Sequence, residues 1–217
     1  MKIALVTPAA AGTRHGNWNT AVRWARLLRE LNHRVVVQLS WDGRAADALI
    51  ALHARRSHES VVRFARAFPQ RPLVLALTGT DLYRDIRTSA AARRSLELAT
   101  RLIVLQEQGL LELPAAARGK TRVIYQSCRT VTPPAPLARG FEVIVSGHLR
   151  AEKDSFRCAA ALRHLPAASR IAVTHMGGAR DPAMEQEALR WTARETRYRW
   201  LGSVPHAQAL RILAAAG

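Results

Sequence analysis

Apolar segments with the length of β-strands alternate along this chain with segments that have the spacing of amphipathic helices. The first strand is expected at residues 2–7 (KIALVT), and a helix is expected at residues 17–31, where apolar side chains recur every three or four positions. Further strands are expected at residues 35–39, 47–53, 73–77, 102–105, 123–125, 141–146, 171–175 and 198–201. Parallel strands need a crossover between them, which a helix of this length supplies. The sequence therefore predicts an α/β fold of Rossmann-like, doubly wound parallel sheets.

A proline-rich segment at residues 130–140 (TVTPPAPLARG) interrupts this alternation. Its three prolines disfavour a helix or a central strand and favour a semi-rigid connector. We therefore expect an N-terminal domain at residues 1–128, a linker at 129–140 and a second Rossmann-like domain at 141–217. Three strands are expected in the second domain, fewer than a doubly wound sheet needs, so we expect this domain to be incomplete.

The formal net charge of +17 raises the question of nucleic-acid binding. Lys2, Lys120 and Lys153 are the three lysines, and the other 30 of the 33 cations are arginines scattered among alanines. The sequence has no lysine-rich tail, Cys/His finger or aromatic RNA-binding box, so a nucleic-acid partner is not expected. No apolar run approaches the ~20 residues of a membrane helix. Cys128 and Cys158 are isolated, as expected for reduced thiols in a cytoplasmic protein.

The segment at residues 141–156 (FEVIVSGHLRAEKDSF) combines an expected strand, a glycine turn and the start of a helix. The strand stops at Gly147, and Asp154 or Ser155 can cap the helix that follows. Free N–H groups and the positive end of a helix dipole attract anions at such a turn, which here also contains His148, Arg150 and Lys153. The segment therefore predicts an anion site. An ordinary loop with solvated cations is the alternative.

Other candidate residues follow expected strands of the first domain, and ligands of doubly wound sheets bind at the carboxyl ends of the strands. The candidates for substrate binding are Gly12, Arg14, His53, Arg55, Arg56, Gly79 and, in the second domain, Gly202. Thr78 and Asp81 in the turn TGTD are the candidates for catalysis. Simpler alternatives are that Asp81 caps the next turn and that Arg55 and Arg56 are solvated loop residues.

Several of these motifs, in chain order, resemble the GT-B glycosyltransferases of the large retaining family 4. Residues 147–153 (GHLRAEK) resemble the family's donor loop Gly-Arg-Leu-x-x-x-Lys, and residues 200–204 (WLGSV) resemble its Phe-Leu-Gly-x-Val strand. Residues 16–35 resemble its glycine loop, helix and Gly-His-x-Val turn. The resemblance covers the whole chain and implies two Rossmann-like domains and a UDP-sugar as co-substrate. It implies no metal or other cofactor, and the sequence has no Asp-x-Asp element.

By this resemblance the donor diphosphate would be bound by Gly147, His148, Arg150 and Lys153. The chain departs from the family pattern in that His148 stands where the family has Arg, so Arg150 would substitute for that residue. Thr78 stands where relatives often have His. The acidic Glu-x(7)-Glu motif, which holds the donor sugar and ribose, is expected beyond residue 217, so we expect this chain alone to turn over poorly.

Longer phrases narrow the resemblance to the selenosugar synthases of selenoneine biosynthesis. They are ALHARRSH (51–58), ALTGTDLYRD (76–85), RSLELATRLIVLQ (94–106), RVIYQS (122–127) and GHLRAEKD (147–154). The implied reaction joins a sugar from a UDP-sugar to the selenium of selenophosphate, a small anionic acceptor. Three alternatives stay open: another GT-B glycosyltransferase, a nucleotide-sugar epimerase, and an inactive fragment or basic binding module.

Overall fold

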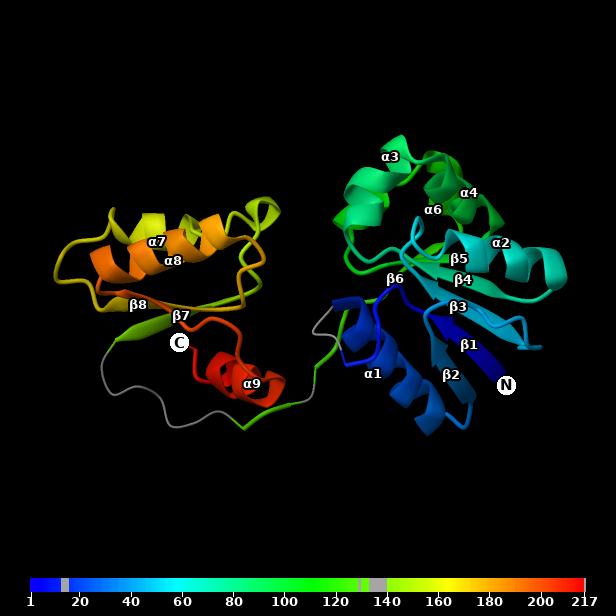
Figure 1. The fold of residues 1–217 in the computed structure, drawn as a ribbon, viewed down its shortest axis with the longest axis horizontal. Helices are drawn as coiled ribbons and strands as arrows, with labels where there is room; N and C mark the ends of the chain where they lie inside the picture. Colours follow the sequence, from blue (N-terminus) through cyan, green and yellow to red (C-terminus); the bar gives the residue numbers. More distant parts are fainter. Residues whose placement is uncertain (13–15, 129, 133–139, 217) are drawn as a thin grey trace. The chain divides into compact units, whose positions relative to one another are not determined.

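The computed structural model describes residues 1–12, 16–128, 130–132 and 140–216. The chain divides into two compact units, Met1–Ser127 and Cys128–Gly217, and each forms its own parallel sheet (Figure 1). The expected α/β architecture of parallel sheets is therefore confirmed. Most of the proline-rich segment, including residues 133–139, lies outside the described residues. No helix in the described part of the chain has both the length and the apolar character needed to cross a membrane.

The first unit contains a six-stranded parallel sheet with the strand order β2-β1-β3-β4-β5-β6. Its strands are β1 (Lys2–Val6), β2 (Arg34–Gln38), β3 (Ala48–Leu52), β4 (Leu73–Ala76), β5 (Arg101–Val104) and β6 (Thr121–Val123). Its helices are α1 (Gly16–Glu30), α2 (His58–Ala67), the π-helix η1 (Asp81–Asp85), α3 (Ile86–Thr88), α4 (Ala90–Leu98), α5 (Gln108–Leu111) and α6 (Ala115–Arg118).

Helices cover both faces of this sheet, as a doubly wound fold requires. Ala21 and Ala25 of α1 pack in one apolar cluster with Leu5 of β1. A second cluster joins Phe64 of α2 and Leu96 of α4 to the opposite side of the strands. Because β1, β3 and β4 are buried on both faces, their sequences are nearly continuous apolar runs.

The second unit contains a three-stranded parallel sheet with the order β7-β8-β9. Its elements are β7 (Phe141–Ser146), the 3-10 turn η2 (Ala151–Lys153), α7 (Arg157–Leu162), β8 (Ile171–Met176), α8 (Pro182–Arg194), β9 (Tyr198–Trp200) and α9 (His206–Ala214). Helices α7 and α8 lie on one face, and α9 lies on the other and contacts β7 (Figure 1). The core is small: Ala159, Leu162, Val173 and Tyr198 are its fully buried members.

The structure differs from the sequence prediction at two places in the first unit. The turn at residues 78–81 leads directly into η1 and α3, which the periodicity did not predict. Helix α6 was also not predicted, because its four residues, Ala-Ala-Ala-Arg, contain no apolar stripe. The strands lie within a few residues of their expected positions, and so does the helix expected at residues 17–31.

Candidate functional site

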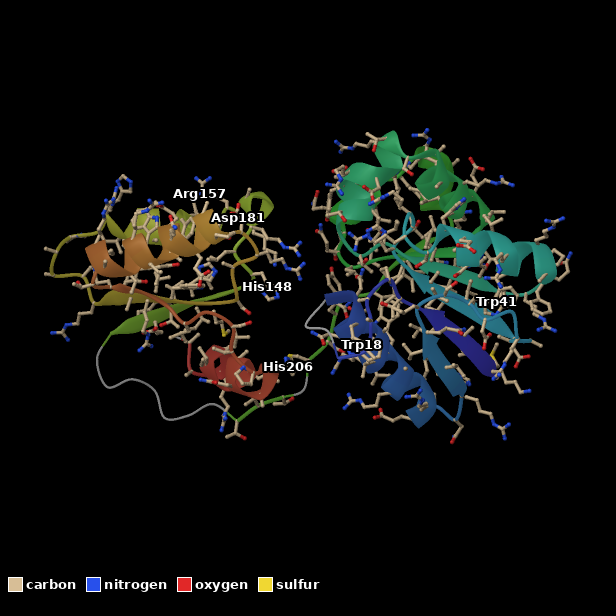
Figure 2. All side chains as sticks on the ribbon, viewed as in Figure 1. Trp18, Trp41, His148, Arg157, Asp181 and His206 are labelled. Carbon is tan, nitrogen blue, oxygen red and sulfur yellow. The ribbon has the colours of Figure 1, made fainter. Side chains whose placement is uncertain are left out.

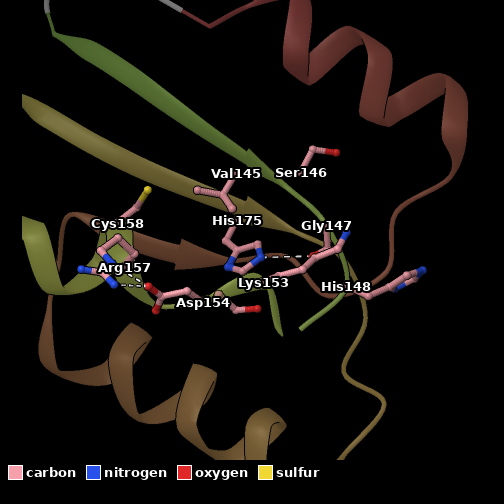
Figure 3. Close-up of a pocket in the computed structure, with 10 residues that line it drawn as sticks. Val145, Ser146, Gly147, His148, Lys153, Asp154, Arg157, Cys158 and His175 are labelled. Carbon is pink, nitrogen blue, oxygen red and sulfur yellow. Dashed lines mark hydrogen bonds and ion pairs between the residues drawn. The ribbon is translucent and has the colours of Figure 1, made fainter. Parts of the chain in front are cut away.

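A pocket of about 290 Å³ lies in the second unit at the carboxyl ends of β7 and β8, beside the start of α7 (Figure 3). Its lining residues are Val145, Ser146, Gly147, His148, Lys153, Asp154, Ser155, Arg157, Cys158 and His175. Three of the four residues expected to bind the donor diphosphate thus line one pocket. This position, at the carboxyl ends of parallel strands, is where doubly wound sheets bind their ligands.

Beside the pocket, the loops after β7 and β8 come into backbone contact at Gly147, which lines the pocket, and Gly177, which does not; this contact is called the crossing below. A Cβ atom on Gly177 would lie 1.9 Å from the carbonyl oxygen of Gly147, so position 177 accepts no side chain. The φ angle of Gly177 is 144°, which also favours glycine. The Gly147 N–H donates to the carbonyl of Met176 (2.9 Å), and the Gly177 N–H donates to that of Gly202 (2.7 Å). Gly202 therefore supports the crossing from the loop after β9 and is not among the lining residues.

The side chain of Lys153 passes over this crossing. Its Nζ atom is 3.1 Å from the position that a Cβ atom of Gly147 would occupy. Among the described residues, no carboxylate or hydrogen-bond acceptor is paired with this ammonium. Arg157, which also lines the pocket, is instead paired with Asp154 (Nε to Oδ2, 2.6 Å), as Figure 3 shows. Lys153 is therefore the lining cation whose charge is available to an anion.

The helix start beside the pocket differs from the prediction. Asp154 and Ser155 do not cap α7: the helix begins at Arg157 after Phe156, and no side chain caps it. Asp154 adopts a left-handed conformation with φ 46°. The Ser155 hydroxyl instead accepts the N–H of Arg150 (3.0 Å) and closes the loop that contains Lys153. Because α7 has six residues, its dipole is short, and the charge of Lys153 is the main attraction for an anion.

The two other expected donor residues point to different partners. The Nδ1 atom of His148 lies 3.2 Å from the carbonyl of Gly178 and donates to it, and the His148 ring points away from His175 (Figure 3). Arg150 lines a neighbouring pocket of about 350 Å³, together with Arg180 and Asp181. The structure therefore brings Gly147, His148 and Lys153 together and places Arg150 beside them.

His175, which the sequence analysis did not select, lies at the end of β8 and points into the pocket. Its Nε2 atom is 3.2 Å from the carbonyl oxygen of Gly147, and its Nδ1 atom is 3.0 Å from the hydroxyl of Tyr198. Burial lowers the pKa of His175, and the nearby charge of Lys153 lowers it further, against the opposing effect of the bond to Gly147. Burial raises the pKa of Tyr198 to about 12, and its proximity to Cys158 contributes. Both groups are therefore uncharged at neutral pH.

In the first unit, the structure assigns Asp81 a structural position. Its carboxylate is fully buried and accepts three backbone N–H groups, from Ala54 (2.9 Å), Thr78 (3.0 Å) and Gly79 (2.9 Å). A carboxylate held in this way joins the loop after β3 to the loop after β4, and it is not presented to a substrate. The geometry therefore does not support a catalytic role for Asp81. The Thr78 hydroxyl is buried and has no hydrogen-bond partner among the described residues.

His53 lies at the centre of a polar cluster at the carboxyl ends of β3 and β4. It is buried and has a φ angle of 75°, a strained conformation for a residue with a side chain. Its Nε2 atom is 3.3 Å from the Thr80 hydroxyl and 3.9 Å from Asp85, and its Nδ1 accepts the N–H of Arg56 (3.3 Å). Burial lowers the pKa of His53, although Asp81 and Asp85 act in the opposite direction. His53 is therefore a neutral, enclosed group that holds the two loops together.

Two arginines of this cluster are paired with a carboxylate, and a third is not among the residues paired with it. Arg55 donates to Asp85 (2.7 Å), as does Arg84 (3.1 Å). Burial acts to raise the pKa of Asp85, but these two arginines outweigh it and hold that pKa below its usual value. Arg56 is exposed. Arg56 is therefore the cation of this cluster that is better placed to meet a ligand.

The remaining expected residues contribute to loop geometry or fall outside the structure. Gly12 (φ 76°) and Gly79 (φ 146°) adopt positive φ angles in the loops after β1 and β4. Arg14 lies outside the described residues. In the view of Figure 2, nitrogen-tipped side chains are spread around each unit, in line with the scattered arginines of the sequence.

No protein-family model and no curated protein sequence matches this chain. Solved structures do match. The chain aligns over its full length with 72% of HepE from Anabaena, solved in complex with UDP, at a TM-score of 0.66 and 18% identity. The chain therefore has the GT-B fold, which consists of two Rossmann-like units.

Two further proteins with solved structures of this fold are enzymes named for different reactions. The lipopolysaccharide outer core galactosyltransferase WaaB matches 96% of this chain with 70% of its own (TM-score 0.55, 13% identity). The UDP-GlcNAc 2-epimerase of Methanocaldococcus jannaschii matches 98% of this chain with 76% of its own (TM-score 0.57, 8% identity). At these identities the likeness shows the fold, and the reaction must be argued from the site.

Proposed function

We propose that this chain is a glycosyltransferase that uses a UDP-sugar and binds the donor diphosphate at Lys153. The observation that supports the proposal is the ammonium of Lys153, which lies over the Gly147–Gly177 crossing without a carboxylate partner among the described residues. A diphosphate needs a close approach to the backbone and a nearby positive charge, and this crossing offers both. HepE, which has the same fold, was crystallised with UDP and with UDP-glucose.

The proposed chemistry follows from the charge that develops on the leaving group. When the bond between the anomeric carbon and UDP breaks, its electron pair leaves with UDP, and negative charge grows on the β-phosphate. A cation beside the leaving group, such as Lys153, binds that charge better in the transition state than in the ground state and so accelerates the reaction. We propose that this reaction needs no metal, and activity that persists in EDTA would support this part.

The proposed acceptor is a small anion, and the phrases shared with selenosugar synthases favour selenophosphate. A bond then forms between its selenium and the anomeric carbon as the bond to UDP breaks. Because selenium in selenophosphate is already a strong nucleophile, a general base is less necessary. This agrees with a buried Thr78 hydroxyl at the position where relatives often have His, and with an Asp81 saturated by backbone donors.

Protection of Cys158 by UDP would test the donor site directly. Cys158 lines the pocket and Cys128 is exposed elsewhere, so Cys128→Ser leaves one thiol that reports on the pocket. Millimolar UDP should slow alkylation of Cys158, and uridine, which lacks the diphosphate, should not. Lys153→Ala should abolish the protection, whereas Lys2→Ala, a matched lysine deletion in the first unit, should preserve it. Equal alkylation rates with and without UDP would contradict the proposed donor site.

Product analysis would test the reaction. A panel of UDP-sugars incubated with selenophosphate should give UDP and a selenium-containing sugar by mass spectrometry. Conversion of a UDP-sugar into its epimer without an acceptor would indicate the epimerase alternative. Salt-sensitive binding to nucleic acid, together with indifference to UDP, would indicate a basic binding module.

A further inference from the structure

The proposed chemistry uses Lys153 and leaves the neighbouring His175 without a role. His175 is 1% exposed at the end of β8, and its ring contacts the carbonyl of Gly147 (Figure 3). On its other side the ring contacts the hydroxyl of Tyr198. Both ring nitrogens have a partner. The three residues belong to three different strands or strand ends, β7, β8 and β9, so the contact crosses the whole sheet of this unit.

The partners determine which ring nitrogen carries the proton. A backbone carbonyl can only accept a hydrogen bond, so Nε2 of His175 must donate to Gly147. In the neutral ring Nδ1 is then an acceptor, and the Tyr198 hydroxyl donates to it. The Gly147 carbonyl thus selects the tautomer, because the Nδ1–H tautomer would place the lone pair of Nε2 against the carbonyl oxygen. The Tyr198 hydroxyl, which can donate or accept, adapts by donating to Nδ1.

The carbonyl that His175 holds belongs to the turn over which Lys153 lies. In a planar trans peptide the carbonyl and the N–H point in opposite directions, so a bond to the Gly147 carbonyl also sets the direction of the His148 N–H. The Gly177 backbone touches the same peptide from the other loop, and the Lys153 side chain packs against the Cα of Gly147. A rotation of this peptide would therefore move the surface on which the ammonium rests.

We propose that His175 is a positioning residue for the donor diphosphate: its Nε2–H holds the Gly147 peptide in the orientation that places the Lys153 ammonium over the crossing. This inference rests on the proposed function, because the diphosphate is the ligand that the oriented turn and ammonium bind. Tyr198 acts one step further away by donating to Nδ1 of His175.

Two amide variants separate positioning from a general loss of packing. The amide nitrogen of Gln reaches the place of Nε2, whereas the shorter Asn reaches the place of Nδ1, so His175→Gln can keep the bond to Gly147 and His175→Asn cannot. Both remove the buried ring and should lower the melting temperature. The readout is the Kd for UDP, measured by NMR titration into the millimolar range. A role in packing alone would change this Kd equally in the two variants, whereas a positioning role would change it in only one of them.

We expect His175→Gln to keep the Kd for UDP within about threefold of the wild type and His175→Asn to raise it roughly tenfold, as loss of one hydrogen bond predicts. The ¹⁵N shifts of the imidazole in the chain without UDP should show the Nε2–H tautomer. Equal changes in Kd for the two variants, or an Nδ1–H tautomer, would overturn the inference while leaving the donor site intact. A wild-type chain that binds no UDP would instead overturn the proposed function, and the inference with it.

Discussion

Gly177 and Gly147 touch so closely that a methyl group on Gly177 would lie 1.9 Å from the Gly147 carbonyl oxygen. This crossing joins the carboxyl ends of β7 and β8 and supports the pocket that contains Lys153. The contact is between backbones, so it cannot be relieved by moving a flexible side chain. The second unit therefore depends on a glycine at this position for both its fold and its proposed ligand site.

Substitution at the crossing should destabilise the second unit. Gly177→Ala combines this clash with an unfavourable positive φ, and we expect a loss of about 3 kcal/mol or more in the unfolding free energy of that unit. Gly178→Ala in the same turn is the matched control, because its Cβ would meet the Ser203 hydroxyl at 3.2 Å and that side chain can move. Denaturant unfolding followed by Trp fluorescence would measure both. Equal stability of the two variants would contradict the structure of this turn.

Removal of the Lys153 charge should impair the use of the donor. If UDP-sugar transfer is measured, Lys153→Ala should lower kcat/KM by two to three orders of magnitude, since a charge-assisted contact to the developing anion contributes roughly 3–4 kcal/mol. Arg150→Ala should also lower kcat/KM, but less, because Arg150 lines the neighbouring pocket. His148→Ala should have the smallest effect. An unchanged kcat/KM in the Lys153 variant would remove this loop from the mechanism.

Asp81→Asn should reduce the stability of the first unit, and a loss of turnover without a loss of stability is not expected. The amide can still accept two of the three backbone N–H groups, but its NH₂ would face the third donor, so about 1–3 kcal/mol should be lost. Asp42→Asn at a surface turn is the control, because it keeps the oxygen that accepts the Arg44 N–H. A catalytic Asp81 would give the reverse pattern, with normal denaturant unfolding and lost turnover.

The stability of the first unit should fall on mild acidification. The pKa of His53 is lowered in the folded state, so its contribution is fully present above the unfolded value of about 6.5 and is lost as the pH falls through the folded value. The slope from this single group should not exceed about 1.4 kcal/mol per pH unit. His53→Asn should flatten the dependence between pH 7 and 5, since Asn tolerates the left-handed backbone and does not titrate. The measurement is the unfolding free energy of the wild type and of His53→Asn at each pH in this range. If the two proteins showed the same dependence on pH, His53 would not be responsible for it.

Charge reversal at Arg56 should affect the acceptor. Because Arg56 is exposed and Arg55 is held by Asp85, Arg56→Glu should raise KM for an anionic acceptor about tenfold and leave hydrolysis of the donor unchanged. Arg55→Glu should also destabilise the unit, because it places a second carboxylate beside Asp85. Steady-state kinetics with and without the acceptor separate these effects. Equal losses with and without acceptor in the Arg56 variant would indicate a folding defect.

The sequence by itself determined the architecture of this protein and the place of its candidate site. Strands such as β7 and helices such as α1 were predicted because burial on one or two faces imposes a local apolar pattern. Gly147 and Lys153 could be selected together because only five residues of one loop lie between them.

Tertiary structure alone decided the roles of Asp81, His175 and Gly177. The Asp81 carboxylate is satisfied by Ala54, 27 residues earlier, and His175 holds Gly147, 28 residues earlier. Whether a polar group faces a ligand or a backbone N–H depends on which loops meet at the end of the sheet, and no local pattern encodes that meeting. For the same reason, a turn glycine at residue 177 could be recognised in the sequence, but the Gly147 backbone that excludes any side chain there could not.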